Sequence, residues 1–198
     1  MSHKLRFAAL LLAALALGAA NAPVPPVGPA DMVLGRPDAP VTVIEYGSLT
    51  CPHCAVFDQA IFPRLKTEWI DTGRIRFVFR DYPRDRVDLL AFQLAHCGGN
   101  HFFWALLDRL YQSQAVWSHQ PNPADDLVRL GELAGLPEAK TRACLADQSL
   151  ARASAASLQG GDRAGVDGTP SFFLNGRKVI PWSYEDWQKL LSEPAGRQ

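Results

Sequence analysis

VTVIEYGSLTCPHCAVF, residues 41–57, changes from a β-branched, apolar run to two cysteines three positions apart. Residues 41–46 have the composition of a buried strand. Residues 47–50 turn the chain, and a helix is predicted from about Cys51 or Pro52, because proline is tolerated in the first helical turn, where its missing N–H has no intrahelical partner. The stretch therefore predicts a strand that leads, through a short loop, into a helix with two cysteines at its start.

The position of these cysteines indicates redox chemistry. In a helix Cys51 and Cys54 are i,i+3 neighbours, so their thiols can lie close enough to form a disulfide. The positive end of the helix dipole and the unpaired N–H groups of the first turn favour a thiolate and lower the pKa of Cys51. His53 lies in the same turn and is expected to stabilise that thiolate as a donor or as a cation. A stabilised thiolate favours the dithiol, so the disulfide would be an oxidant, with Cys54 as the resolving thiol.

Two other uses of a C-x-x-C pair compete with this interpretation. A structural zinc site needs four ligands. Cys97 and Cys144 are isolated, and His96, His101 and His119 have no partner at ligand spacing, so no metal site is expected. A purely structural disulfide stays open as an alternative, although closing so short a loop removes little entropy from the unfolded chain.

The N-terminus is typical of a cleaved signal peptide. A basic start at residues 3–6 precedes an apolar run over 7–17, which is too short for a comfortable transmembrane helix and is followed by small residues. Cleavage is expected after Ala20 or Ala22. Ala20 is favoured, because cleavage after Ala22 would place Pro23 beside the cut. The chain is therefore expected to be exported to the periplasm, an oxidising compartment in which disulfides persist. Its 20 basic and 20 acidic residues give no support to nucleic-acid binding.

The segments around the cysteine pair predict a βαβ unit. Residues 23–40 are rich in proline and glycine and are expected to form an extended arm. The helix should run to Thr72 with a kink or break at Pro63, and residues 75–80 should form a second strand parallel to the first.

The remaining segments predict helices followed by a hairpin. Apolar spacing predicts helices over 87–97, 102–117, 122–134 and 137–144 and an alanine-rich one up to 158, with the pattern broken at Gly160-Gly161. Asn175-Gly176 predicts a type I′ turn between two short strands, 171–174 and 177–180. Ser183 is expected to cap a last helix over 184–191.

Two distant motifs make the chain resemble a known family. Cys51-Pro52-His53-Cys54 follows a buried strand, and Gly168-Thr169-Pro170-Ser171-Phe172-Phe173 follows far downstream. Together with the intervening helices, these motifs resemble the DsbA-like branch of the thioredoxin superfamily, over residues 31–191. The resemblance implies an α/β thioredoxin fold interrupted by an inserted α-helical domain. The expected division is a signal peptide (1–20), an extended arm (21–40), a first thioredoxin part (41–84), the helical insertion (85–160) and a second thioredoxin part (161–198).

The resemblance also implies roles for residues outside the C-x-x-C motif. Pro170 should have a cis bond to Thr169 and lie beside the disulfide, where an extended substrate could pair with the Thr169 backbone. Glu45 matches a buried acid of this branch and is expected to relay protons to Cys54 or to pair with a base such as Arg76. Cys97 and Cys144 would form a second, structural disulfide within the helical insertion.

The function implied is that of a periplasmic thiol–disulfide oxidoreductase that donates disulfides to exported proteins through Cys51 and Cys54. No cofactor is expected, the protein is expected to be a monomer, and a DsbB-like membrane quinone reductase would reoxidise it. Two alternatives stay open: a disulfide isomerase or reductase, and a non-catalytic secreted binding module on a thioredoxin scaffold.

Overall fold

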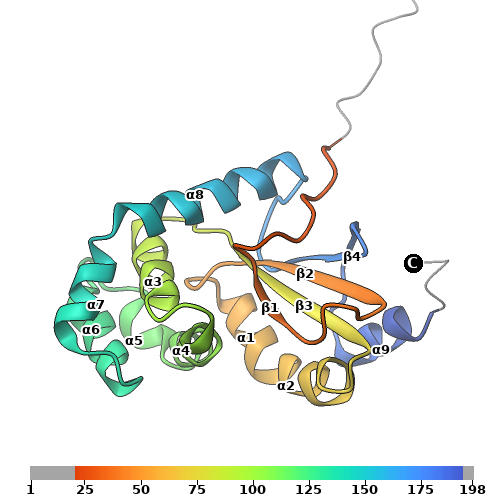
Figure 1. The fold of residues 1–198 in the computed structure, drawn as a ribbon, viewed down its shortest axis with the longest axis horizontal. Helices are drawn as coiled ribbons and strands as arrows, with labels where there is room; N and C mark the ends of the chain where they lie inside the picture. The colour runs from red at the N-terminus through yellow and green to blue at the C-terminus, as the bar shows by residue number, and fades with distance from the viewer. Residues whose placement is uncertain (1–20, 194–198) are drawn as a thin grey trace, which may run out of the picture.

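A five-stranded mixed sheet lies at the centre of the protein, whose computed structural model describes residues 21–193 (Figure 1). Its order is β1-β3-β2-β4-β5. The strands are β1 (Met32–Leu34), β2 (Val41–Gly47), β3 (Ile75–Asp81), β4 (Ser171–Leu174) and β5 (Arg177–Val179). The β2–β3 pair is parallel, and the other three pairs are antiparallel. The predicted βαβ unit is thus present, and the hairpin supplies the two strands beyond β2.

The side chains of β2 alternate between two buried layers. Val41 and Val43 pack beneath α1 (Pro52–Ala60), α2 (Phe62–Leu65), the π-helical turn η1 (Lys66–Ile70) and α9 (Tyr184–Ser192). Ile44 and Tyr46 face the opposite layer, which the N-terminal arm and the end of α8 (Gln148–Arg163) cover. Because both faces of the sheet are covered, β2 is apolar on both sides, which explains its nearly continuous β-branched run.

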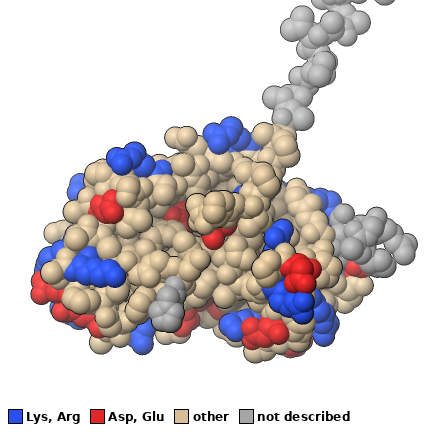
Figure 2. Space-filling model, in the orientation of Figure 1, with Lys and Arg blue, Asp and Glu red and all other residues tan. Residues whose placement is uncertain are grey.

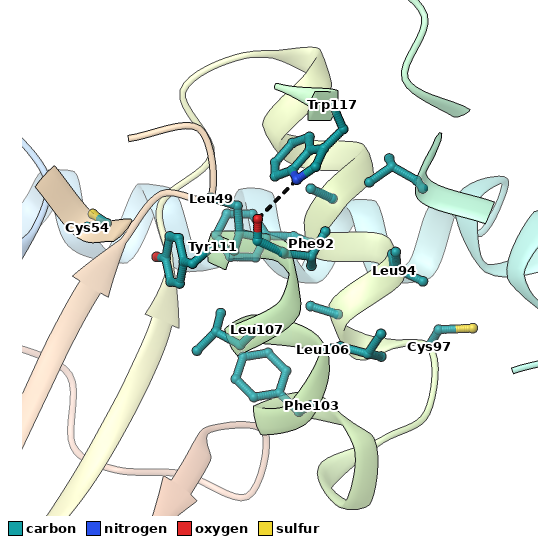
Figure 3. Packing of buried hydrophobic residues seen from close by; sticks show 14 of the residues in the cluster. Leu49, Cys54, Phe92, Leu94, Cys97, Phe103, Leu106, Leu107, Tyr111 and Trp117 are labelled. Carbon is teal, nitrogen blue, oxygen red and sulfur yellow. Dashed lines mark hydrogen bonds between the residues drawn. The ribbon is translucent and has the colours of Figure 1, made fainter. Parts of the chain in front are cut away.

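A second hydrophobic core holds the helical insertion together. Its helices are α3 (Arg86–His96), α4 (Asn100–Gln112), α5 (Gln114–Trp117), α6 (Ala124–Leu133) and α7 (Glu138–Leu145), followed by α8. Figure 3 shows Phe92, Leu106 and Trp117 packed together, with the Trp117 indole N–H donating to the Leu110 carbonyl oxygen at 3.0 Å. Leu49 and Cys54 belong to the same buried cluster, so the insertion packs directly against the cysteine-bearing helix.

Most of the expected elements are present, with three differences, the first being that the helix expected over 102–117 is divided into α4 and α5. The helix after Cys51 breaks at Ile61, between α1 and α2, as Pro63 predicts. The arm, expected to be extended, contains a short strand, β1, which pairs with β3. The predicted break at Gly160-Gly161 is wrong, because α8 runs through both glycines to Arg163.

A glycine is needed at position 161 because α8 packs closely against two tyrosine rings there. A Cβ atom at this position would lie 3.0 Å from both the Tyr46 and the Tyr82 rings, so the glycine lets α8 approach the sheet closely. The predicted signal peptide lies outside the described residues. Within residues 21–193, no helix has both the length and the apolar character needed to cross a bilayer. On the face drawn in Figure 2, basic and acidic side chains are interspersed and do not gather into one patch.

Candidate active site

The register of β2 and β4 brings the two motifs together. Tyr46, near the end of β2, is paired with Ser171 at the start of β4. Because these strands are antiparallel, the loop that leaves β2 lies beside the residues that lead into β4. Cys51, which follows that loop, is the N-cap of α1, and Pro52 takes a first-turn position, as predicted. The Thr169–Pro170 peptide bond is cis, and the Cys51 thiol lies 3.1 Å from the Thr169 carbonyl oxygen.

The surroundings of Cys51 favour its thiolate. They lower the pKa of Cys51 to about 5, chiefly through the hydrogen bond from the Cys54 thiol, against the effect of burial. A hydrogen bond with the Thr169 side chain and hydrogen bonds from the backbone N–H groups of Cys54 and His53 lower it further. These N–H groups belong to the first turn of α1 and have no partner inside the helix. The helix N-terminus therefore acts on this sulfur in the direction that the sequence predicts.

His53 contacts the Cys51 sulfur through its backbone, and the predicted role of its imidazole stays a prediction. Its side chain is exposed, and its contribution to the low pKa of Cys51 comes from its backbone N–H. Among residues 21–193, the structure shows no hydrogen bond from the imidazole to the sulfur. In this arrangement the imidazole ring lies at the protein surface.

Cys54 and Glu45 lie beneath Cys51 in an apolar layer. Cys54 is fully buried, and burial raises the pKa of its thiol well above the usual value, so Cys54 stays protonated while Cys51 ionises. Glu45 is 3% exposed, and burial, followed by the charges of Asp58 and Cys51, raises its pKa well above the usual range. Its Oε1 atom has no hydrogen-bond partner within the described part of the chain.

The expected pairing of Glu45 with Arg76 does not occur. The Arg76 guanidinium donates to the Thr42 hydroxyl at 2.7 Å and to the Pro37 carbonyl oxygen at 3.3 Å. Thr42 and Glu45 are three positions apart on β2, so their side chains point to opposite faces of the sheet. Arg76 therefore lies on the other face from Glu45.

Asp58 is a further buried carboxyl that the sequence analysis did not identify. It lies four residues after Cys54 on α1, so the two side chains share one helix face. Asp58 is 8% exposed, its Oδ2 atom has no partner among the described residues, and burial raises its pKa to about 7. The i,i+4 spacing from Cys54 was the signal that could have found it. The buried side of the dithiol thus holds two carboxyl groups, and both favour the protonated form.

An apolar groove runs beside Cys51. Its volume is about 380 Å³, and its walls include His53, Val56, Thr169, Pro170 and the segment 178–182. Three apolar side chains at this groove are unusually exposed: Val56 at 61%, Ile180 at 69% and Trp182 at 83%. The groove is thus lined by α1 on one side and by the cis-proline loop and the segment after β5 on the other.

The second cysteine pair is a disulfide remote from this groove. Cys97 and Cys144 are joined with a Cα–Cα distance of 5.5 Å, which ties the end of α3 to α7. In Figure 3, Cys97 and Cys54 lie on opposite sides of the buried cluster. In the part of the chain that the structure covers, His, Cys, Asp and Glu residues form no group of three or more that could hold a metal ion.

Comparison with known proteins gives consistent matches. Residues 28–193 match the family described as Thioredoxin. A Rickettsia prowazekii relative named "Putative protein-disulfide oxidoreductase" is 35% identical over 165 residues, which cover 82% of this chain and 61% of the relative. A Bacillus cereus protein named "Probable disulfide bond formation protein D" is 30% identical over 167 residues, which cover 81% of this chain and 76% of that protein.

A solved structure extends the match to three dimensions. The crystal structure of Wolbachia pipientis α-DsbA1 superimposes with a TM-score of 0.79 at 26% identity, covering 86% of this chain and 94% of that chain. The present chain spans only about 60% of the length of the Rickettsia relatives that it matches. The similarity thus covers nearly all of the described residues but only part of those proteins.

Proposed function

Because the chain belongs to the DsbA-like branch of the thioredoxin family, we propose that it is a periplasmic thiol–disulfide oxidoreductase that donates the Cys51–Cys54 disulfide to exported proteins. The observation that carries the proposal is the contrast between the two thiols. Cys51, with a pKa of about 5, is the better leaving group, and the buried Cys54 retains its proton.

The proposed reaction has two exchange steps. A substrate thiolate attacks the Cys51 sulfur of the oxidised protein, which breaks the Cys51–Cys54 bond and leaves the two proteins joined by a mixed disulfide. Cys54 departs as a thiolate and takes up a proton. The second substrate thiolate then attacks the substrate sulfur of the mixed disulfide, and Cys51 departs as a stable thiolate. The substrate has lost two electrons, and the enzyme has gained them as its dithiol. Stabilising that dithiol drives the transfer forward.

Glu45 is proposed to supply the proton for Cys54. It lies on the face of β2 beneath α1, and burial raises its pKa well above the usual range, which favours the protonated carboxyl that can donate. Asp58, with a pKa of about 7, could exchange that proton onward, since it lies on the same helix face as Cys54. A buried thiolate leaving group without such a donor would remain an unpaired charge in an apolar layer.

The apolar groove is proposed to hold an extended segment of the substrate. The backbone around Thr169 would pair with it in the manner of an added strand, while Val56, Ile180 and Trp182 contact its side chains. Such contacts suit unfolded chains, which still expose the apolar residues that folding will bury. Pairing with the backbone would let the protein accept many different substrates, because every peptide offers the same N–H and carbonyl groups.

We further propose export with cleavage after Ala20, a monomeric state, and reoxidation by a membrane quinone reductase resembling DsbB. The Ala22 backbone N–H donates to the Arg163 carbonyl oxygen at 2.8 Å. Cleavage after Ala20 leaves this bond intact, whereas cleavage after Ala22 would remove it. The intact mass of the exported protein tests this, with Asn21 expected as the first residue.

The function is tested with a reduced, unfolded protein whose cysteines pair in its native state. The oxidised wild type should restore the native disulfide, and Cys51→Ser should abolish that activity. Cys54→Ala should accumulate a mixed disulfide through Cys51. The double variant C97A/C144A is the matched control and should retain oxidation. Oxidation that survives in Cys51→Ser would contradict the mechanism, and efficient repair of scrambled disulfides without net oxidation would favour an isomerase.

A further inference from the structure

Side chains of the helical insertion hold the loop between β2 and α1. The Asp88 carboxylate, fully buried on α3, accepts hydrogen bonds from the Ser48 hydroxyl at 2.7 Å and from the Leu49 N–H at 2.8 Å. The Tyr111 hydroxyl on α4 donates to the Ser48 carbonyl oxygen at 3.3 Å. The start of this loop is therefore fixed by groups that come from outside the βαβ unit.

Gln114, the first residue of α5, holds the end of the same loop. Its Nε2 atom donates to the Leu49 carbonyl oxygen at 2.7 Å and to the Cys51 carbonyl oxygen at 3.0 Å. An amide nitrogen carries two hydrogens, so these two bonds use its whole donor capacity. The Cys51 carbonyl also accepts from the Ala55 N–H at 3.2 Å, which is the first turn of α1. Gln114 thus joins the last part of the loop to the first turn of the cysteine-bearing helix.

We propose that Gln114 is a positioning residue that holds Cys51 against the N-terminus of α1. The low pKa of Cys51 comes chiefly from the Cys54 thiol and further from the N–H groups of Cys54 and His53, and these groups reach the sulfur only while the first helical turn keeps its geometry. Gln114 bonds the carbonyl of the N-cap itself, so it fixes the peptide unit from which the reactive side chain projects. Its consequence for disulfide donation rests on the function proposed above, whereas its effect on the thiol does not.

A neutral amide meets the requirements of this position. Two carbonyl oxygens converge on one side chain, so the position needs two donors and no negative charge. A glutamate here would place carboxylate oxygens against those carbonyls and beside the Cys51 thiolate. A methionine would preserve the length and shape of the side chain while offering neither donor. The two substitutions therefore separate the loss of the hydrogen bonds from the added repulsion.

The experiment compares Gln114→Met, Gln114→Ala and Gln114→Glu with the matched control Gln112→Ala. Gln112 is an exposed residue of α4 whose amide bonds only the Asp108 carboxylate, among the hydrogen bonds of the described residues. The readouts are the thiolate titration of Cys51, followed by its absorbance near 240 nm, and the equilibrium constant with glutathione. Circular dichroism shows that each variant is folded.

Gln114→Met and Gln114→Ala should raise the Cys51 pKa by about one unit, which makes the disulfide about tenfold less oxidising at neutral pH. Gln114→Glu should raise the pKa further, and Gln112→Ala should leave it unchanged. A folded Gln114→Met protein with the wild-type pKa would overturn the proposal. If oxidation is absent in the wild type while the pKa still rises in Gln114→Met, the proposed function fails and the positioning role stands.

Discussion

The Cys51 sulfur lies 3.1 Å from the carbonyl oxygen of Thr169, a residue 118 positions further along the chain. This contact joins the start of α1 to the loop that precedes β4. Any peptide that pairs with the backbone beside Pro170 must therefore pass within reach of the sulfur. Thr169 also lines the apolar groove that contains Trp182, so the reactive thiol contacts a residue of that groove.

The first prediction concerns the acidity of Cys51. Titration of the reduced protein should show one thiolate transition with a midpoint at about pH 5, because hydrogen bonds and the first turn of α1 stabilise the charged form. The measurement is the absorbance near 240 nm, with alkylation by iodoacetamide as an independent readout. Cys51→Ser should lack this transition. A midpoint above pH 8 would show that the helix N-terminus does not act on this sulfur.

The second prediction concerns the apolar groove. Trp182→Ala should reduce kcat/KM for a cysteine-containing peptide by about five- to tenfold, because an exposed aromatic contact with the substrate is lost. The Cys51 pKa and the rate with a small dithiol should not change. Val116→Ala is the matched control, since Val116 is 59% exposed on α5 and does not line the groove. Equal losses in both variants would contradict the assignment of the groove.

The third prediction concerns Asp58. Its pKa is about 7 in the folded protein and near 4 in the unfolded chain, so the folded state binds the extra proton between these values. A raised carboxyl pKa makes stability fall as the pH increases through this window. Asp58→Asn should therefore stabilise the protein at pH 8 relative to pH 4 by up to about 4 kcal/mol. Urea unfolding of the wild type and the variant at both pH values measures the difference.

The outcome of this test also bears on the proton route. If the difference in unfolding free energy is the same at both pH values, Asp58 does not titrate in this window.

Glu45→Gln should also stabilise the protein more at pH 8 than at pH 4, because the pKa of Glu45 is also raised by burial. If Glu45 supplies the proton, this variant should slow release of Cys54 at neutral pH and alter its pH dependence. An unchanged pH profile would leave the carboxyl with a purely structural role.

The fourth prediction concerns the second disulfide. The Cys97–Cys144 bond closes a loop with a sequence separation of 47. In the chain-entropy model, its removal in C97A/C144A should cost about 4 kcal/mol of unfolding free energy. Because the bond lies on the far side of the insertion core, the Cys51 pKa and the glutathione equilibrium of Cys51–Cys54 should be unchanged. A shift in either would show that the second pair takes part in the redox chemistry.

The sequence predicted the elements that depend on local patterns. The strand before Cys51, the break near Pro63 and the Ser183 cap follow from composition, proline geometry and a capping side chain, and the structure has all three. The prediction that the cis-proline loop lies beside Cys51 needed the family resemblance as well, because no local pattern in residues 168–173 determines where that loop lies in the fold.

Other features depend on contacts that sequence does not display. His96, for which the sequence offered no partner, has a largely buried ring that bonds the Asp81 carboxylate at 2.8 Å. Its position follows from the packing of α3 against the end of β3. Gln114 and Asp58 were likewise missed, since their roles depend on the loop and helix that the fold brings to them.

The continuity of α8 through Gly160-Gly161 has a mechanical consequence. One unbroken ladder of backbone hydrogen bonds begins among the insertion helices and ends against the sheet, where Gly161 fits between Tyr46 and Tyr82. The helical insertion therefore cannot rotate about this connection unless part of α8 unfolds. The insertion also cannot be deleted without affecting the sheet, because removal of residues 85–160 would leave only the last few residues of α8 to cover this face of the sheet. If the protein acts on substrates of different shapes, as proposed, the loops around the Cys51 sulfur would have to accommodate them, because the sheet and the helical insertion are rigidly joined by α8.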